Sequence, residues 1–432
     1  MSISAPISLF SQEELEQICK DLQLKLDGGN KYSKFKKVEY FDAYELDDNN
    51  GVFLPLAYAI GAFKEKIKSA KPEAFRKLNL VFTGVLREEQ VKVKDEAIKN
   101  LNKNKACLIS CFPGFGKTLT SIYISLKINL KTLIIVNKLT LISQWVESIN
   151  KLTDNKAKVK VLSVGKFIED ADDFVIVNCI NIPKFERMKH FGTLIVDECH
   201  LITSKILSQS IFRVTPRYVI GLSATPYRPD GLNKLLDFFF TDIKIVRNLY
   251  CPHTVYKVVT GFKPIVEYGV DGKVNWNKIL EGQCGDETRN NLIVDIVVKH
   301  KNRNFMILSK RVEQSTFLHA KLLERGERAA ILVGSAKEFD KDCRILIGTS
   351  SKLGTGFDFV KLNALILASD MEEYFIQYLG RIFRVSQTSK DFVKPIVFDL
   401  LDENPILTRH FATRKKVYQE AGGTIENYSH WE

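Results

Sequence analysis

The chain of 432 residues is too long for a single hydrophobic core, and the usual domain size predicts about three folding units. A hydrophobic fraction of 45% and a charged fraction of 26% exclude a disordered chain, and we find no apolar run that spans a bilayer. The formal net charge of +12 fits a polyanionic partner, although a lysine-rich composition without such a partner explains the charge equally well.

The first residues of the chain and its cysteines narrow the possible class of protein further. Residues 1–6 lack the basic region and apolar run of a secretory signal, so we expect an intracellular protein that binds no membrane. The eight cysteines include no Cys-x-x-Cys pair. This pattern argues against a zinc site or an iron–sulfur cluster and favours reduced, mostly buried thiols.

Residues 1–82 differ in pattern from the rest of the chain. Apolar residues recur at helical spacing over 12–25 and predict a helix there. A basic run and an acidic patch follow this helix, and we interpret the whole region as a small accessory domain of unknown fold.

From about residue 83, short β-rich apolar runs alternate with amphipathic stretches, which predicts an α/β protein with parallel sheets. We predict two α/β lobes in tandem, 83–246 and 247–402, followed by a C-terminal tail, 403–432. We interpret the glycine-rich stretch 247–290 as an irregular connector and the entry to the second lobe. The predicted strands are 106–110, 132–136, 174–177, 193–196 and 218–222, then 304–308, 329–333, 344–348, 364–367 and 395–399.

A phosphate-binding loop is predicted directly after strand 106–110. The loop carries two glycines, a lysine and a hydroxyl side chain: Gly114, Gly116, Lys117 and Thr118. A loop between a strand and a helix N-terminus aims backbone N–H groups at the phosphates of a nucleotide. We expect Lys117 to contact the β- and γ-phosphates and the Thr118 hydroxyl to bind Mg²⁺. Cys111 replaces the first glycine of the usual pattern.

Before this loop, Arg87 and Gln90 belong to a second segment of the predicted nucleotide site. Gln90 offers both a donor and an acceptor, which is what reading the edge of an adenine requires. A solvated glutamine on a helix is the simpler interpretation of this segment alone.

An acidic pair, Asp197-Glu198, follows the apolar strand 193–196, at the strand end where open α/β sheets bind ligands. Asp197 is predicted to hold Mg²⁺ through a water, and Glu198 to orient and deprotonate the attacking water. His200 lies within reach of the next strand end. There the hydroxyls of Ser223 and Thr225 are predicted to bond to His200 or to its acidic neighbours and to couple nucleotide state to movement.

The second lobe supplies two arginines of the kind that act on a γ-phosphate. Over the predicted helix 373–385, Gln377, Arg381 and Arg384 share one face at positions i, i+4 and i+7. Arginines without an intervening acid suit a phosphate, so we predict arginine fingers; the alternative is a solvated basic face. After strand 344–348, Gly356 allows close backbone approach and Asp358 is a candidate acceptor for a ribose hydroxyl.

These segments resemble the motifs of superfamily 2 helicases over about residues 83–400. The sequence Asp197-Glu198-Cys199-His200, the segment 225–231 and the segment 380–384 are similar to the branch of the TFIIH repair helicase. That branch also holds a phage recombination helicase and the transcript-release helicases of poxviruses and other large DNA viruses. The segments 260–264 and 289–293 are most similar to the viral members.

The resemblance implies two RecA-like domains, ATP and Mg²⁺ as cofactors, and tracking mainly along DNA. It also implies contacts to the nucleic-acid backbone, which are independent of sequence, from Asn137, Lys138, Gln144, Asn178, Lys310, Arg311 and Thr349. Trp145, at helical spacing from Leu141, is expected in the core instead. The thumb-like insertions and large accessory regions of the family are not recognisable, which argues against strong processive unwinding.

We therefore predict a DNA-dependent ATPase and helicase-type translocase of a large DNA virus, acting as a monomer. Its expected role is transcription termination or transcript release, with an RNA polymerase or transcription factors as partners, or DNA repair. One alternative is an RNA helicase, because the core motifs do not distinguish the sugar. Others are a nucleic-acid-binding scaffold with a decayed ATPase and the motor subunit of a restriction or nuclease complex.

Overall fold

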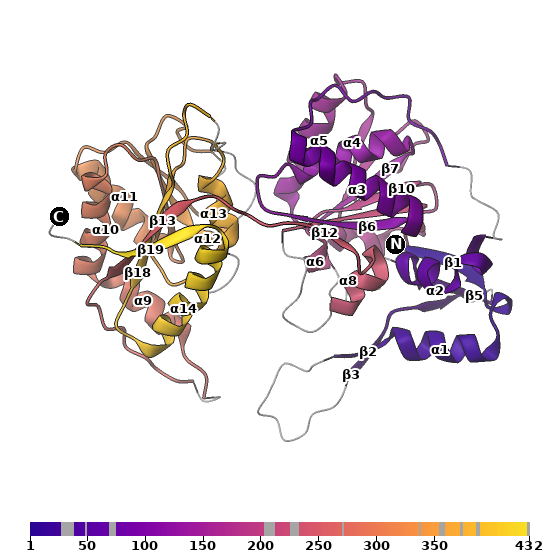
Figure 1. The fold of residues 1–432 in the computed structure, drawn as a ribbon, viewed down its shortest axis with the longest axis horizontal. Coiled ribbons are helices and arrows are strands. Elements are labelled where there is room, and N and C mark those ends of the chain that lie inside the picture. The colour runs from indigo at the N-terminus through magenta and orange to yellow at the C-terminus, as the bar shows by residue number, and fades with distance from the viewer. Residues whose placement is uncertain are drawn as a thin grey trace. The chain divides into compact units, whose positions relative to one another are not determined.

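The computed structural model describes residues 1–26, 39–47, 50–68, 75–202, 212–224, 233–269, 272–336, 338–353, 359–371, 375–385 and 389–429. The chain divides into two compact units, Met1–Arg247 and Asn248–Glu432 (Figure 1). Residues 1–82 form part of unit 1. Over the described ranges, no helix combines the length and the apolar character that crossing a bilayer demands.

Unit 1 is built on a parallel sheet with the strand order β12-β6-β11-β10-β7-β9-β8. Its strands are β6 (Ala106–Cys111), β7 (Thr132–Val136), β8 (Val159–Leu162), β9 (Phe174–Asn178), β10 (Thr193–Val196), β11 (Tyr218–Ser223) and β12 (Lys244–Arg247). The inner strands are near-continuous Val, Ile and Leu runs, because both faces of the sheet are covered. The five predicted strands of this lobe are confirmed to within one residue at each end. The pattern did not predict β8 and β12, which are edge strands and only partly buried.

Helices cover both faces of this sheet. One face carries α3 (Glu88–Asn104), α4 (Lys117–Ile128) and α5 (Leu139–Leu152), and the other carries α6 (Cys199–Ile202) and α8 (Asn233–Phe240) (Figure 1). A short 3-10 helix, η2 (Cys179–Lys184), follows β9. Helix α5 buries Trp145, Ile149 and Leu152 against the sheet, which confirms the expected core position of Trp145.

The N-terminal part of unit 1 forms small antiparallel sheets that pack on the large one. These contain β1 (Ser2–Pro6), β5 (Gly51–Pro55) and β4 (Glu45–Asp47) in the order β1-β5-β4, and the pair β2 (Gln23–Leu26) and β3 (Glu39–Asp42). The predicted helix over 12–25 is present as α1 (Gln12–Leu22), with a capping box at Ser11 and Glu14; it ends at Leu22 because β2 begins there. The remaining elements are η1 (Ile7–Leu9) and α2 (Leu56–Lys68).

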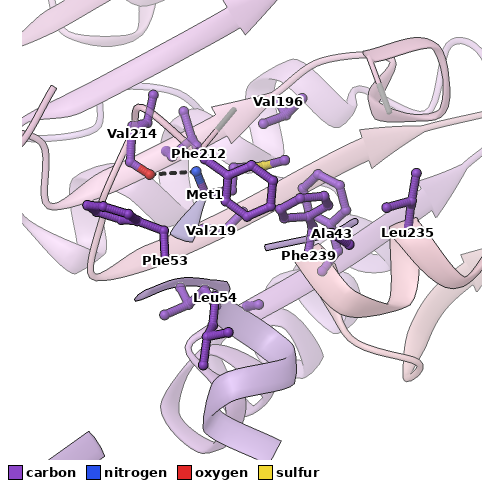
Figure 2. Close-up of a cluster of buried hydrophobic side chains, with 14 of the residues drawn as sticks. Met1, Ala43, Phe53, Leu54, Val196, Phe212, Val214, Val219, Leu235 and Phe239 are labelled. Atoms are coloured by element: carbon purple, nitrogen blue, oxygen red, sulfur yellow. Dashed lines mark hydrogen bonds between the residues drawn. The ribbon is translucent and has the colours of Figure 1, made fainter. Parts of the chain in front are cut away.

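Figure 2 shows how this N-terminal part is held on the sheet. Phe53 and Leu54 of β5 belong to the same buried apolar cluster as Phe212 and Phe239. The nitrogen of Met1 donates to the carbonyl of Val214 at 2.5 Å. Because the two regions share one core, residues 1–82 are part of the first compact unit.

Unit 2 contains a second parallel sheet, with the strand order β15-β16-β14-β17-β18-β13-β19. Its strands are β13 (His253–Val259), β14 (Phe305–Ser309), β15 (Ala329–Leu332), β16 (Ile345–Thr349), β17 (Ala364–Leu367), β18 (Ile396–Leu401) and β19 (Gly423–Asn427). Its helices are α9 (Trp276–Gly285), α10 (Glu287–Lys299), α11 (Val312–Glu324), α12 (Ser350–Leu353), α13 (Ile376–Ile382) and α14 (Pro405–Glu420). The predicted class, two α/β lobes with parallel sheets, is confirmed.

Three predictions for this lobe were wrong. The stretch 247–290 is not an irregular connector, because it holds β13, α9 and the start of α10. Residues 403–432 are not a tail, because α14 packs on β18 and β19 pairs with β13 at the sheet edge. The predicted helix over 373–385 does not reach residue 385, because α13 ends at Ile382. The sequence interpretation missed these elements because glycines, lysines and a mixed polar pattern obscure the spacing of their apolar residues.

Candidate functional site

The predicted phosphate loop lies between the buried strand β6 and the start of α4. Gly116 is the N-cap of α4, with φ at 92°, and Gly114 also has a left-handed φ of 86°. Lys117 occupies the first position of the helix, where its Nζ donates to the carbonyl of Cys111 at 2.8 Å. Thr118 follows it and is partly exposed. The lysine and the hydroxyl therefore sit at a helix N-terminus, the place where anions bind.

Gly116 is required for two reasons. Its left-handed φ disfavours any side chain, and a Cβ at this position would lie 2.3 Å from Nε2 of Gln90. The loop thus fits closely around a glutamine that lies well before it in the chain, at the start of α3.

Gln90 and Arg87 fasten the phosphate loop to α3. Gln90 is 3% exposed; its Oε1 accepts from the backbone N–H of Arg87 at 2.8 Å, and its Nε2 donates to the carbonyl of Phe115 at 2.8 Å. The Arg87 guanidinium donates to the carbonyls of Gly114, at 3.3 Å, and Phe115. Both predicted nucleotide-site residues therefore contact the loop, and their contact with an adenine stays a prediction.

The acidic pair lies at the carboxyl end of β10, which is flanked by β7 and β11. Asp197 is 8% exposed, and its Oδ1 accepts from the backbone N–H of Glu198 at 3.0 Å. Burial, followed by the neighbouring Glu198 charge, raises the pKa of Asp197 to about 6. Glu198 adopts a φ of 47°, a conformation that is rare outside glycine, so the backbone turns sharply between the two acids. Backbone outliers of this kind cluster at functional sites.

Trp145 is a site residue that sequence reasoning assigned only to the core. It is 1% exposed, and its indole Nε1 donates to Oδ2 of Asp197 at 2.9 Å. The helical spacing predicted its burial correctly. No pattern in the sequence indicated its partner, because the two residues lie on different elements, 52 positions apart.

On the other side of the acidic pair, His200 connects α6 to the end of β11. Its Nδ1 lies 2.9 Å from Oγ of Ser223 and 3.5 Å from Oε2 of Glu198. The predicted contact between His200 and Ser223 is therefore present. Their coupling role stays a prediction, and Thr225 lies outside the described residues.

The donor atoms of this site suit a hard cation. Asp197 offers a carboxylate and Thr118 a hydroxyl, and oxygen ligands of this type are what Mg²⁺ prefers. Within the residues that the structure describes, no cluster of three or more His, Cys, Asp or Glu side chains can hold a metal ion. Mg²⁺ commonly takes one or two protein ligands together with phosphate oxygens and water, so one carboxylate and one hydroxyl fit it.

The predicted nucleic-acid residues of unit 1 gather along the same sheet edge. Asn137 and Lys138 follow β7, and Asn178 ends β9, where its Oδ1 accepts from the Ile180 N–H at 3.0 Å. Lys138 is exposed, Asn137 is half-buried and Asn178 is buried. Gln144, which is half-buried, lies further along α5.

Beside them lies an exposed apolar surface that sequence reasoning missed. Leu139 is 72% exposed, Ile180 is 63% exposed and Phe167 is 83% exposed. They follow the carboxyl ends of β7, β9 and β8, which are neighbours in the sheet. We call these three residues the apolar edge. Exposed Lys138 directly precedes Leu139 and exposed Lys166 directly precedes Phe167, so a basic side chain adjoins two of the three residues.

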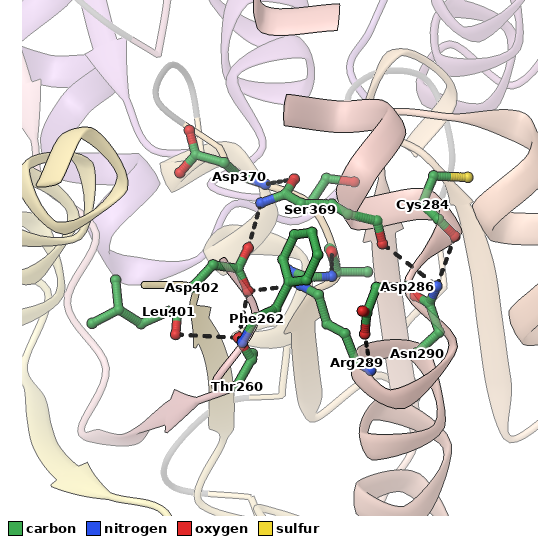
Figure 3. A network of polar contacts seen from close by, with 12 residues as sticks. Thr260, Phe262, Cys284, Asp286, Arg289, Asn290, Ser369, Asp370, Leu401 and Asp402 are labelled. Carbon is green, nitrogen blue, oxygen red and sulfur yellow. Dashed lines mark hydrogen bonds and ion pairs between the residues drawn. The ribbon is translucent and has the colours of Figure 1, made fainter. Parts of the chain in front are cut away.

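In unit 2, the predicted residues Lys310 and Arg311 follow β14, and Thr349 ends β16. Lys310 is exposed, Arg311 half-buried and Thr349 buried. Lys310 is joined to a network of buried polar side chains, part of which Figure 3 shows. Ser369 accepts from the backbone N–H of Lys310 at 3.0 Å and donates to Oε1 of Gln314 at 2.7 Å.

The same network contains a buried ion pair. Arg289 and Asp402 are 1% and 0% exposed at their side chains, and their Nε and Oδ1 atoms lie 2.8 Å apart (Figure 3). Arg289 also donates to the carbonyl of Ala368 at 2.6 Å. Asp402 accepts from Thr260 at 2.6 Å and from Gln283 at 2.7 Å. These bonds join α9 and α10 to the ends of β17 and β18, and they therefore hold the loops at this edge of the sheet in place.

The structure agrees only in part with the predicted helical face of Gln377, Arg381 and Arg384. Gln377 and Arg381 lie on α13, but Arg384 lies beyond its end at Ile382 and does not continue the helical face. All three side chains are half-buried. Their action on a nucleotide stays a prediction, and Gly356 and Asp358 fall outside the described residues.

Comparisons with known proteins agree with this arrangement. Residues 83–228 match the family model described as "Type III restriction enzyme, res subunit". A putative helicase of Invertebrate iridescent virus 6 is 45% identical over 382 residues, covering 82% of this chain and 85% of that protein. A transcript termination protein of Monkeypox virus is 26% identical over 347 residues, covering 69% of this chain and 68% of that protein. A solved structure of S. cerevisiae Dbp5 bound to RNA and ADP BeF3 shares the fold at a TM-score of 0.56 and 13% identity; it covers 80% of this chain and 95% of Dbp5.

Proposed function

Because the chain belongs to the superfamily 2 helicases, as its similarity to the iridovirus protein shows, we propose that it is a DNA-dependent ATPase that uses hydrolysis to move along DNA. The helicase class and two RecA-like domains follow from family membership. What we propose beyond them is the substrate, the residue roles and the biological process.

The observation that carries the proposal is the order of strand ends along one edge of the first sheet. The phosphate loop follows β6, Ser223 ends β11 and the acidic pair follows β10. The candidate nucleic-acid residues follow the next strands, β7, β9 and β8. Since the strands are parallel, a nucleotide site and a nucleic-acid surface occupy adjacent halves of the same edge.

In the proposed reaction, Lys117 binds the phosphates and Glu198 accepts a proton from the water that attacks the γ-phosphorus. The P–O bond to ADP breaks and inorganic phosphate leaves. Mg²⁺, held by Thr118 and Asp197, would neutralise phosphate charge. We also propose that Arg381 and Arg384 stabilise the charge on the transferred group.

For the nucleic acid, we propose contacts from both units to the phosphate backbone. Within the apolar edge, Phe167 adds a ring on which a base can stack, and the flanking lysines carry the complementary charge. This combination favours single strands, whose bases are accessible, over a closed duplex. DNA is the proposed substrate because the resemblance is to a branch that tracks on DNA.

The proposed biological role is transcript release, which the similarity to a transcript termination protein supports. An RNA polymerase would then be a partner. Release of a labelled transcript from a stalled elongation complex tests this role. It should require ATP and should disappear in the Lys117→Ala variant; ATP-dependent activity on recombination intermediates alone would point to DNA repair.

Stimulation of ATP hydrolysis by DNA and by RNA strands of equal length tests the substrate. We expect the larger stimulation with single-stranded DNA. Lys117→Ala should abolish hydrolysis and leave DNA affinity largely intact, while Arg384→Ala should keep ATP binding but slow turnover by about 10³-fold. Stronger stimulation by RNA would favour the RNA helicase instead, and normal turnover in either variant would remove the proposed role of that residue.

A further inference from the structure

Trp145 makes a hydrogen bond, although an apolar side chain without a donor would fill the same position in the core. A buried indole N–H needs a partner, but phenylalanine or leucine fills an apolar position without one. Here the partner is a carboxylate oxygen of Asp197, at 2.9 Å, in a site where both residues are almost fully buried. Water competes weakly for such a bond, so the indole limits how the Asp197 carboxylate is oriented.

The carboxylate is fixed at both of its oxygens. Oδ1 accepts from the N–H of Glu198 at 3.0 Å, and Oδ2 accepts from Trp145. The first bond lies within the acidic pair itself and is set by the backbone turn there. The second comes from α5, which is a separate element. A change in the position of α5 therefore alters the orientation of Asp197 without moving the backbone of β10.

The start of helix α5 also belongs to the proposed nucleic-acid surface of unit 1. It begins at Leu139, directly after Asn137 and Lys138, and Leu139 is 72% exposed on the apolar edge. Ile149 and Leu152 bury the rest of its inner face, so the helix packs as one body. The exposed start of α5 and the indole on its second turn are thus parts of one rigid segment.

We propose that Trp145 is a positioning residue through which nucleic acid bound at the start of α5 sets the orientation of Asp197 and so the affinity for magnesium nucleotide. This inference rests on the proposed function. It differs from the coupling predicted for His200, which connects the acidic pair to Ser223 on β11, the strand on the opposite side of β10. The acidic pair then has one connection on each side: His200 toward β11 and Trp145 toward β7.

The test uses Trp145→Phe in the full chain, because phenylalanine keeps an aromatic ring and removes the donor. Binding of a fluorescent ADP analogue is measured with and without MgCl₂, and with and without poly(dT). Affinity for the metal-free nucleotide should change less than about twofold. The Mg²⁺ concentration for half-maximal binding should rise about tenfold, as expected when a charge-assisted hydrogen bond is lost.

Poly(dT) separates positioning from plain packing. In the wild type, poly(dT) should lower the Mg²⁺ concentration for half-maximal binding, and by linkage Mg²⁺-nucleotide should tighten poly(dT) binding by the same factor. In Trp145→Phe both effects should shrink to less than about twofold. Ile149→Val is the matched control, since Ile149 is fully buried on the same helix face and has an apolar side chain. It should leave both effects intact.

A second measurement covers the case in which Trp145→Phe does not fold. The chain has three tryptophans, so the variant with Trp276→Phe and Trp431→Phe leaves Trp145 as the sole reporter. Its emission should shift when Mg²⁺-ADP and poly(dT) are added together. An unchanged emission, or a Trp145→Phe variant with wild-type Mg²⁺ and poly(dT) dependence, overturns the inference alone. A wild type whose nucleotide binding and hydrolysis ignore poly(dT) overturns the proposed function as well.

Discussion

Replacing Gly116 by alanine should damage the phosphate loop more than its backbone conformation alone predicts. A left-handed φ costs a non-glycine residue roughly 1–2 kcal/mol. The new Cβ would also lie 2.3 Å from Nε2 of Gln90, so this buried side chain must move. It would then lose its bonds to Phe115 and Arg87, at roughly 1 kcal/mol each. We therefore expect Gly116→Ala to lower the free energy of unfolding of unit 1 by roughly 3–4 kcal/mol.

Gly165→Ala is the matched control in the same unit. Gly165 has a φ of 82°, and no atom lies within 4 Å of the position that a Cβ would take, so only the backbone cost of roughly 1–2 kcal/mol applies. Urea unfolding followed by circular dichroism measures both variants. Gln90→Ala should cost less in the Gly116→Ala background than in the wild type, because the bonds of Gln90 are already lost there. Equal costs for the two glycine variants, or additive costs of Gly116→Ala and Gln90→Ala, would refute the proposed contact between Gln90 and the loop.

Two further results are expected from other parts of the chain. Arg289→Met should destabilise unit 2 by roughly 3–5 kcal/mol in urea unfolding, since it leaves Asp402 buried without its cation, and Arg289→Met/Asp402→Asn should cost less; an additive double variant would contradict the ion pair. Phe167→Ala should weaken binding of poly(dT) about tenfold in fluorescence anisotropy but leave binding of an abasic strand of equal length unchanged; equal losses on both strands would rule out base stacking.

The sequence predicted the inner parts of both sheets well, for a physical reason. A strand covered on both faces must be almost wholly apolar, so runs such as 132–136 and 364–367 are recognisable by composition alone. The edge strands β8, β12 and β19 are partly exposed and carry polar or charged residues among the apolar ones, which removes that signal. Strand β13 is an inner strand, but His253, Tyr256 and Lys257 interrupt the apolar run by which such a strand is recognised.

The candidate site was predictable where function depends on residues close together in the sequence. Gly116-Lys117-Thr118 and Asp197-Glu198 need only a strand before them to be placed at a sheet edge. Among contacts between distant segments, the bond between His200 and Ser223 was predicted, but others were missed, since no local pattern encodes them. The bonds of Gln90 to Phe115 and of Trp145 to Asp197 both belong to this class. The position of Arg384 on a helix was predicted wrongly, because a helical spacing was assumed beyond Ile382, where α13 ends.

The most direct test of the central claim is phosphate release by wild type and Glu198→Gln, each with and without poly(dT). Glutamine keeps the size of the side chain and removes the proton acceptor. We predict that poly(dT) stimulates the wild type, and that Glu198→Gln loses hydrolysis by about 10³-fold while it still binds both ATP and poly(dT). A wild type that poly(dT) does not stimulate, or a Glu198→Gln variant that turns over normally, would contradict an ATPase driven by nucleic acid at this edge of the sheet.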